Sequence, residues 1–307
     1  MAPIVQFQNV TRRFGNTLAL DNVSFEIEPG TVFALLGANG AGKTTAIRLM
    51  LGLDSPDSGT VNVMGLDSAK KPLEIRSQVG YVADRPPLYE WMTVDEIGWF
   101  TSGFYPSGFQ AKYDALRARF DVDGSKAIRE LSKGMRAKVA LALSMAHEPP
   151  LLVLDEPTSG LDPLVRREFL ESMVDVASAG RTVFLSSHQV NEVERVADVV
   201  AILLNGKLVC IERLEDLKRN TTEVVLTLPN VEAKPPQMPG QVLAHVPFGH
   251  DLVWMVRNLD AAQLQNVCRD SNLPSPLIRQ PNLEDILLAM LREYRLPSRP
   301  QEVVTTN

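Results

Sequence analysis

Short, uninterrupted apolar runs recur along the first two thirds of the chain. Three of them, residues 32–36, 151–154 and 183–185, each lead into polar or glycine-rich residues and then a helix-like segment. Such runs are typical of parallel strands buried on both faces of a sheet. Residues 23–27 instead alternate apolar and polar side chains before a turn at 28–30, which predicts an antiparallel strand with one wet face. The pattern therefore predicts an α/β fold with an antiparallel β subdomain.

A different pattern fills the stretch from residue 88 to residue 120. It is rich in aromatic side chains at helical spacing and has no buried-strand run, which predicts a mostly helical insertion at about residues 85–145. We expect these aromatic residues to form the insertion's own core, with the loop at 86–89 as a candidate contact site. The residues concerned are Tyr89, Trp91, Trp99, Phe100, Phe104, Tyr105, Phe109 and Tyr113.

The last third of the chain predicts a second, smaller domain. Two apolar runs flank Asn205-Gly206, a pair that favours a type I′ hairpin turn, and the first domain is expected to end near Arg219. We interpret residues 220–307 as an accessory α+β domain. Its predicted strands are 222–228, 242–246 and 252–256, its helices 260–270 and 283–291, with a loop containing Pro235, Pro236 and Pro239 and a frayed tail at 297–307.

Composition narrows the function classes. The chain has 307 residues, which favours about two domains; it is 45% hydrophobic and 22% charged, with a net charge of −6. This is a globular composition that does not suggest a nucleic-acid partner. Cys210 and Cys268 belong to no cysteine cluster, so we expect both to be core residues of a reducing compartment. With no signal-peptide run or spanning stretch, we predict a cytosolic protein that meets a membrane only through a partner.

A phosphate-binding loop follows the first buried run. Residues 37–44, Gly-Ala-Asn-Gly-Ala-Gly-Lys-Thr, fit the motif G-x-x-x-x-G-K-[ST] between a strand and a helix. Backbone N–H groups and the helix N-terminus favour phosphate, Lys43 is expected to reach the β and γ phosphates, and the Thr44 hydroxyl to ligate Mg²⁺. A dinucleotide-binding interpretation fails because Lys-Thr follows the glycines and no ribose-binding acid is placed after the next strand. The predicted nucleotide-binding residues here are Gly37, Asn39, Gly40, Ala41, Gly42, Lys43, Thr44 and Thr45.

Two acids end the second buried run. Asp155 is placed to hold Mg²⁺, and Glu156 to polarise an attacking water. Such a pair at a strand end is weak evidence by itself, but a phosphate loop upstream makes it strong. A phosphorylated ligand with Mg²⁺ is therefore predicted, with Glu156 and Lys43 as catalytic candidates.

Together these motifs resemble the nucleotide-binding subunit of ATP-binding cassette (ABC) transporters. The resemblance covers roughly residues 4–218 and implies a P-loop NTPase cassette. Leu131-Ser132-Lys133-Gly134-Met135 resembles the LSGGQ signature, residues 159–162 the D-loop, and His188 the switch histidine. The resemblance implies MgATP as the ligand and His188 as a third catalytic candidate beside Glu156 and Lys43. By the same resemblance Phe14 would stack on adenine, and Asp84, which stands where the family has the Q-loop glutamine, would lie near Mg²⁺ as a third metal candidate beside Thr44 and Asp155.

Simpler interpretations exist for several of these residues. Ser132 has the residue type of a helix cap, His188 that of a histidine at a helix start, and Phe14 that of a core aromatic. Two departures from the family pattern also matter. Met135 replaces the signature glutamine and removes its amide, and Asp84 brings an anion to the Q-loop position.

The resemblance also implies how the protein works. Ser132, Gly134 and Asp162 would act at the partner's ATP, which requires a head-to-tail homodimer with two ATP at the interface. Separate transmembrane permease subunits would dock on residues 88–120, placing the ATPase on the cytoplasmic face of the membrane. In its short insertion and its acid at position 84, the sequence resembles the ATP-binding subunits of the bacterial exporters that move drugs, lipids or polysaccharides outward. The alternatives are a soluble DNA-repair or ribosome-associated ABC ATPase and a subunit that binds ATP without turnover.

Overall fold

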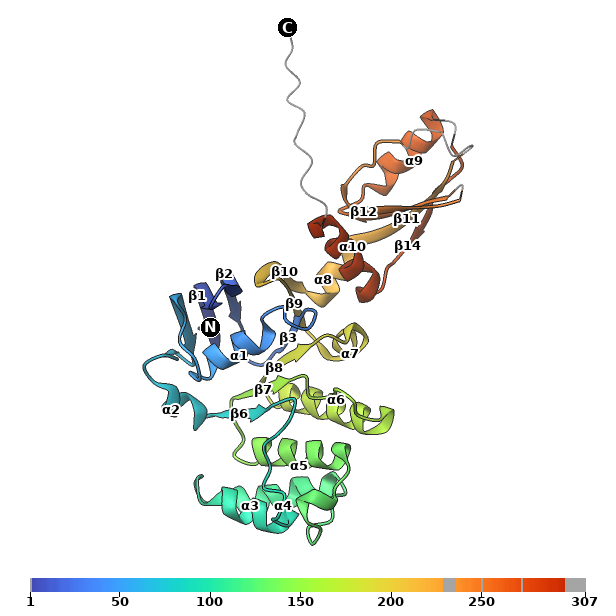
Figure 1. The fold of residues 1–307 in the computed structure, drawn as a ribbon. Coiled ribbons are helices and arrows are strands. Elements are labelled where there is room, and N and C mark those ends of the chain that lie inside the picture. The colour runs from blue at the N-terminus through green and yellow to red at the C-terminus, as the bar shows by residue number, and fades with distance from the viewer. Residues whose placement is uncertain (1, 229–235, 250, 272, 296–307) are drawn as a thin grey trace. The chain divides into compact units, whose positions relative to one another are not determined.

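The structure is a computed structural model that describes residues 2–228, 236–249, 251–271 and 273–295. The chain divides into two compact units, Met1–Glu212 and Arg213–Asn307, so the division falls shortly before Arg219 (Figure 1). Pro235 and the tail predicted at 297–307 lie outside the described residues.

A six-stranded sheet forms the centre of the first unit. The strands that carry the apolar runs pair in parallel and are buried along their whole length, as that pattern predicts. Asn205 and Gly206 both have positive φ, 47° and 79°, which confirms the predicted tight turn. The strand order is β10 (Lys207–Arg213), β9 (Val199–Leu204), β3 (Val32–Leu36), β8 (Thr182–Ser187), β7 (Leu151–Asp155) and β6 (Val79–Val82).

An antiparallel sheet packs against this centre, confirming the predicted β subdomain. The strand predicted at 23–27 is the C-terminal part of a longer strand, Thr17–Ile27, which pairs antiparallel with the strand Val5–Phe14. Phe7, Phe25, Phe33 and Phe184 stack in series, with ring centroids 4.4, 5.5 and 5.7 Å apart, so one continuous core joins the two sheets. The order is β2 (Thr17–Ile27), β1 (Val5–Phe14), β4 (Ser58–Val63) and β5 (Leu66–Asp67).

Helices enclose the sheets, and the predicted helical insertion lies between β6 and β7. Figure 1 shows α3 and α4 at the end of the unit opposite β1 and β2. The two helices approach closely at Gly98, where a Cβ would lie 2.1 Å from the ring of buried Tyr113. The insertion contains α3 (Val94–Ser102), α4 (Phe109–Arg119), the 3₁₀ turn η1 (Ile128–Glu130) and α5 (Lys133–Met145); the other helices of the unit are α1 (Lys43–Met50), α2 (Pro72–Arg76), α6 (Pro163–Ser178) and α7 (Val190–Val196).

The prediction that the aromatic residues form the insertion's core is wrong for most of them. Phe109 and Tyr113 are buried, but Trp91, Trp99 and Phe104 are each at least 70% exposed. Helical spacing shows which side chains share a face, and this face has no neighbouring element to cover it in the described part of the chain. Tyr89 and Phe100 belong to the same exposed cluster, in edge contact at 5.6 Å.

The second unit is a four-stranded antiparallel sheet with helices. Its core contains Val224, Trp254, Leu264 and Cys268, which confirms the prediction for Cys268. Cys210, also predicted to be a core residue, lies on β10 of the first unit and is only half-buried. The short strand β14 is absent from the sequence prediction because its three residues are too few to give a strand pattern. The order is β12 (Gln241–Phe248), β13 (Asp251–Arg257), β11 (Thr221–Thr227) and β14 (Leu277–Arg279), with α8 (Leu214–Arg219), α9 (Ala261–Asp270) and α10 (Leu283–Arg295).

Candidate functional site

The phosphate-binding loop connects β3 to α1, and its glycines are required by close backbone contacts. A Cβ on Gly42, whose φ is +110°, would lie 2.3 Å from the carbonyl oxygen of Ala19. A Cβ on Gly37 would lie 2.5 Å from the carbonyl oxygen of Leu203. Only glycine fits at either position, and α1 then begins at Lys43 with its free N–H groups toward the loop.

The Lys43 side chain is directed back into this loop. It is 6% exposed, and its ammonium donates hydrogen bonds to the carbonyls of Gly37 at 2.7 Å and Ala38 at 3.3 Å. The same nitrogen lies 3.0 Å from Glu156 Oε1, forming a largely buried ion pair. The phosphate loop and the acid at the end of β7 therefore meet, as the motif spacing predicts.

Glu156 is held from several directions. Its φ of +49° is in the left-handed region, which is rare for a residue with a side chain. Its backbone N–H donates to the carbonyl of Ser186 at 3.1 Å. On the side chain, Oε2 lies 2.7 Å from His188 Nδ1, so one carboxylate contacts both a cation and an imidazole.

Asp155 and Thr44 supply adjacent oxygen atoms. The Thr44 hydroxyl donates to Asp155 Oδ2 at 2.9 Å, and the Ser186 hydroxyl donates to Asp155 Oδ1 at 2.5 Å. Hard oxygen donors fit Mg²⁺, which is usually held by one or two carboxylates together with substrate phosphates and water. Among the described residues, no three acidic, histidine or cysteine side chains are arranged so that they could hold a metal ion by themselves.

A cavity of about 410 Å³ brings most of the predicted site together. Thr17 and Ala19 of β2 and Ser159 also line it. Ser159 was predicted only as part of the D-loop. The position of Thr17 and Ala19 at this cavity gave no sequence signal because it depends on how the sheets pack. The predicted residues that line the cavity are Asn39, Gly40, Gly42, Lys43, Thr44, Thr45, Asp84, Asp155, Glu156 and His188.

The other predicted residues lie outside the lining of this cavity. Gly37 and Ala41 belong to the loop itself. Phe14 is 45% exposed under the guanidinium of Arg12, 4.6 Å from the ring centroid, so it is a surface aromatic and not a core one. Among the family-motif residues, the Ser132 hydroxyl accepts from the N–H of Met135, and Asp162 accepts from those of Leu164 and Val165, so both cap helices; Gly134 is buried on α5.

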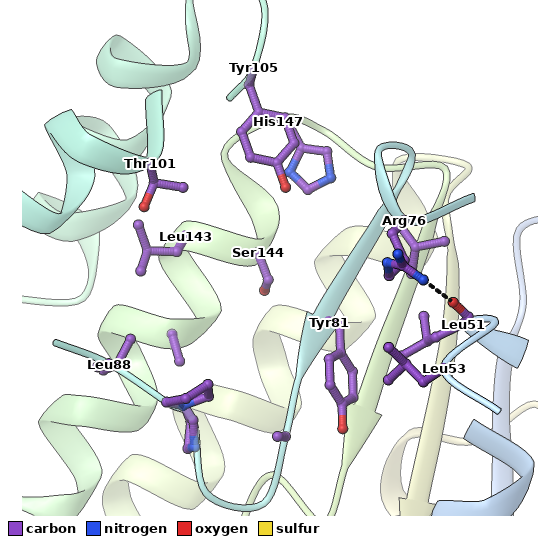
Figure 2. Close-up of a pocket in the computed structure, with 15 residues that line it drawn as sticks. Leu51, Leu53, Arg76, Tyr81, Leu88, Thr101, Tyr105, Leu143, Ser144 and His147 are labelled. Atoms are coloured by element: carbon purple, nitrogen blue, oxygen red, sulfur yellow. Dashed lines mark hydrogen bonds between the residues drawn. The ribbon is translucent and has the colours of Figure 1, made fainter. Parts of the chain in front are cut away.

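A separate groove of about 360 Å³ lies between the sheet and the helical insertion. Figure 2 shows Tyr81 of β6 facing Leu143 and Ser144 of α5 across it. His147 lies at one end of the groove, its ring 4.4 Å from that of Tyr105. Burial lowers the pKa of His147 to about 4, so this histidine is neutral at physiological pH.

Comparison with known proteins agrees with this geometry. Residues 20–159 match the family model described as "ABC transporter". The Nod factor export ATP-binding protein I of Cupriavidus metallidurans is 34% identical over 212 residues, which cover 67% of this chain and 70% of that protein. The chain belongs to the family of ABC transporter ATP-binding subunits.

A second relative and a solved structure belong to the same family. The probable multidrug ABC transporter ATP-binding protein YbhF of Escherichia coli is 37% identical over 220 residues, covering 70% of this chain but only 38% of YbhF. A solved structure of an ATP-binding subunit of an ABC transporter matches with a TM-score of 0.66 and 31% identity, covering 70% of this chain and 92% of that one. None of the described helices of the cassette protein has the length and hydrophobicity of a membrane span.

Proposed function

We propose that this chain binds MgATP in the 410 Å³ cavity and hydrolyses it to power transport. The observation that carries the proposal is the convergence of Lys43 and His188, which are distant in sequence, on the carboxylate of Glu156, at 3.0 and 2.7 Å. Bound Mg²⁺ would neutralise phosphate charge, with Thr44, Asp155 and Asp84 as its protein-side residues.

The three side chains have distinct tasks in this proposal. Glu156 accepts a proton from the attacking water as the water oxygen bonds to the γ phosphorus and the bond to ADP breaks. Lys43 leaves Glu156 and binds the β and γ phosphates, which compensates their charge. His188, in contact with Glu156 Oε2, orients that carboxylate and lies where it would sense the γ phosphate.

The residues outside the cavity support a homodimer. Ser132 and Asp162 stand at the starts of α5 and α6, and Gly134 lies in the first turn of α5, away from the chain's own cavity. Family resemblance assigns them to the ATP of a second copy. We therefore propose a head-to-tail pair with two ATP at its interface.

The groove of Figure 2 is the proposed docking site of a separate transmembrane permease. It is largely apolar, and the helical insertion that forms one side of it also exposes Trp91, Trp99 and Phe104, a surface that is costly to leave in water. The names of the two relatives describe multidrug transport and Nod factor export. These names favour a cytoplasmic-face exporter subunit over a soluble DNA-repair or ribosome-associated ATPase.

The unit Arg213–Asn307 is proposed to be accessory, since the phosphate loop and both acids precede it. A chain that stops near Arg219 is expected to bind MgATP like the parent. Complete loss of binding in a folded truncation would contradict this division.

Hydrolysis and coupling are tested by different variants. The purified chain is expected to hydrolyse MgATP, and no hydrolysis above a protein-free control would defeat the proposed function. To test docking, the chain is co-expressed with the membrane protein encoded beside it. Leu143→Glu in the groove is expected to abolish co-purification, whereas Val174→Glu, an exposed position on α6, is the matched control. Equal co-purification of both variants would remove the groove from the interface.

A further inference from the structure

A second polar contact joins the segment that follows Glu156 to the segment that follows His188. The first is the contact between Glu156 and His188 themselves, at 2.7 Å. Further along both segments, the Thr158 hydroxyl donates a hydrogen bond to Glu192 Oε2 on α7. Thr158 is 1% and Glu192 4% exposed, so this second contact is sealed from water.

Glu192 also connects to α6. Its Oε1 lies 3.1 Å from Arg166 Nε, and Arg166 Nη2 donates to the carbonyl oxygen of Leu161 at 3.2 Å. A carboxylate buried this deeply is costly unless it is paired; here Oε2 accepts a hydrogen bond and Oε1 lies in an ion pair. The buried side chain of Glu192 thus fixes residues 156–161 at two points, through Thr158 and through Arg166.

The backbone at Glu156 needs such support. Left-handed φ at a residue with a Cβ costs about 1–2 kcal/mol, and the Glu156 φ is +49°. Upstream, the N–H of Glu156 is bound to Ser186. Downstream, Pro157 offers no N–H, so the Thr158 hydroxyl is the next side-chain anchor along the chain.

We propose that Glu192 is a positioning residue, which acts through Thr158 and Arg166 to keep the Glu156 carboxylate in line for proton abstraction. The proposal rests on the proposed function of Glu156 as general base. A displacement of about 1 Å in a catalytic group can cost about 100-fold in rate. The network would therefore affect turnover much more than nucleotide binding, because Lys43 and the phosphate loop are anchored on β3 and α1.

Two variants remove different parts of the network. Thr158→Val keeps the shape of the side chain and deletes the hydroxyl that donates to Glu192. Glu192→Gln keeps an acceptor for that hydroxyl and deletes the charge that pairs with Arg166. The matched control is Thr182→Val, since Thr182 is 0% exposed, accepts from the N–H of Gly30 at 3.0 Å, and lies at the end of β8 opposite His188.

The expected result is a separation of kcat from KM. In Thr158→Val and Glu192→Gln, kcat for MgATP is expected to fall about 10- to 100-fold, with KM, directly measured MgATP affinity and melting temperature close to those of Thr182→Val. Thr158→Ser, which restores the hydroxyl, is expected to recover most of the parental kcat.

Three results would overturn the inference. The first is a kcat in Thr158→Val that is no lower than in Thr182→Val. The second is a KM or an MgATP affinity that changes in proportion to kcat. The third is a kcat in Thr158→Ser as low as that of Thr158→Val. If Thr158→Val does not fold, the same comparison is made with Glu192→Gln. Absence of hydrolysis by the parent would defeat the proposed function itself, whereas a normal parental rate with unaffected variants would defeat only the positioning role.

Discussion

Replacing Glu156 with glutamine separates hydrolysis from binding. The amide keeps the size of the carboxylate and one oxygen, but it cannot accept a proton from water at neutral pH. Loss of a general base lowers kcat by about 100- to 10,000-fold, or about 3–5 kcal/mol. We therefore expect Glu156→Gln to bind MgATP and to hydrolyse it at a small fraction of the parental rate.

The structure predicts in addition that MgATP binds more tightly to this variant. Lys43 must leave Glu156 Oε1, 3.0 Å away, before it can contact phosphate. The gross attraction of unit charges at that distance is ~5.5 kcal/mol at an effective dielectric constant of ~20. If only a fifth of that opposes binding, removing the charge strengthens binding by ~1 kcal/mol, or about fivefold.

The assay measures MgATP affinity and steady-state hydrolysis on the same protein sample. Glu171→Gln, at an exposed acid on α6 that pairs with Arg167, is the matched control and should resemble the parent in both. Light scattering with MgATP and with MgADP then tests whether uncleaved ATP traps a closed pair. Parental turnover by Glu156→Gln would refute the role of the acid, and weaker MgATP binding would refute the argument from the ion pair.

Three further changes are expected to have distinct effects. Lys43→Ala should reduce MgATP affinity at least about 100-fold, since a charge-assisted contact to the phosphates is lost. Unchanged affinity in a binding titration would show that the nucleotide does not bind at this loop. Gly42→Ala should lower the free energy of unfolding by about 1–3 kcal/mol in urea titrations, because its Cβ would meet the Ala19 carbonyl at 2.3 Å. The unfolded chain binds more protons at His147 than the folded one, whose pKa is about 4, so stability should fall as pH drops from about 6.5 toward 4. His147→Phe should flatten that part of the pH–stability curve, and an unchanged slope would contradict the assigned pKa.

Local sequence determined a large part of this protein. The glycines within residues 37–42 stand where the backbone conformation or a close contact excludes other residue types, so the phosphate loop could be predicted from the sequence. The uninterrupted apolar runs likewise identify strands buried on both faces, because such strands have no wet side on which to place polar residues. Both signals are confined to a few neighbouring residues. The chemistry of Lys43, Asp155 and Glu156 could be predicted for that reason.

Tertiary structure alone decided which distant residues meet. The contact between Thr158 and Glu192 depends on the order of β7 and β8 and on the path of α7, and neither residue stands out in the sequence. The same holds for Ala19, which limits Gly42 only because the two sheets pack together. Helical spacing could not predict the exposure of Trp99, since periodicity shows which side chains share a helix face and only the packing of other elements determines whether that face is covered.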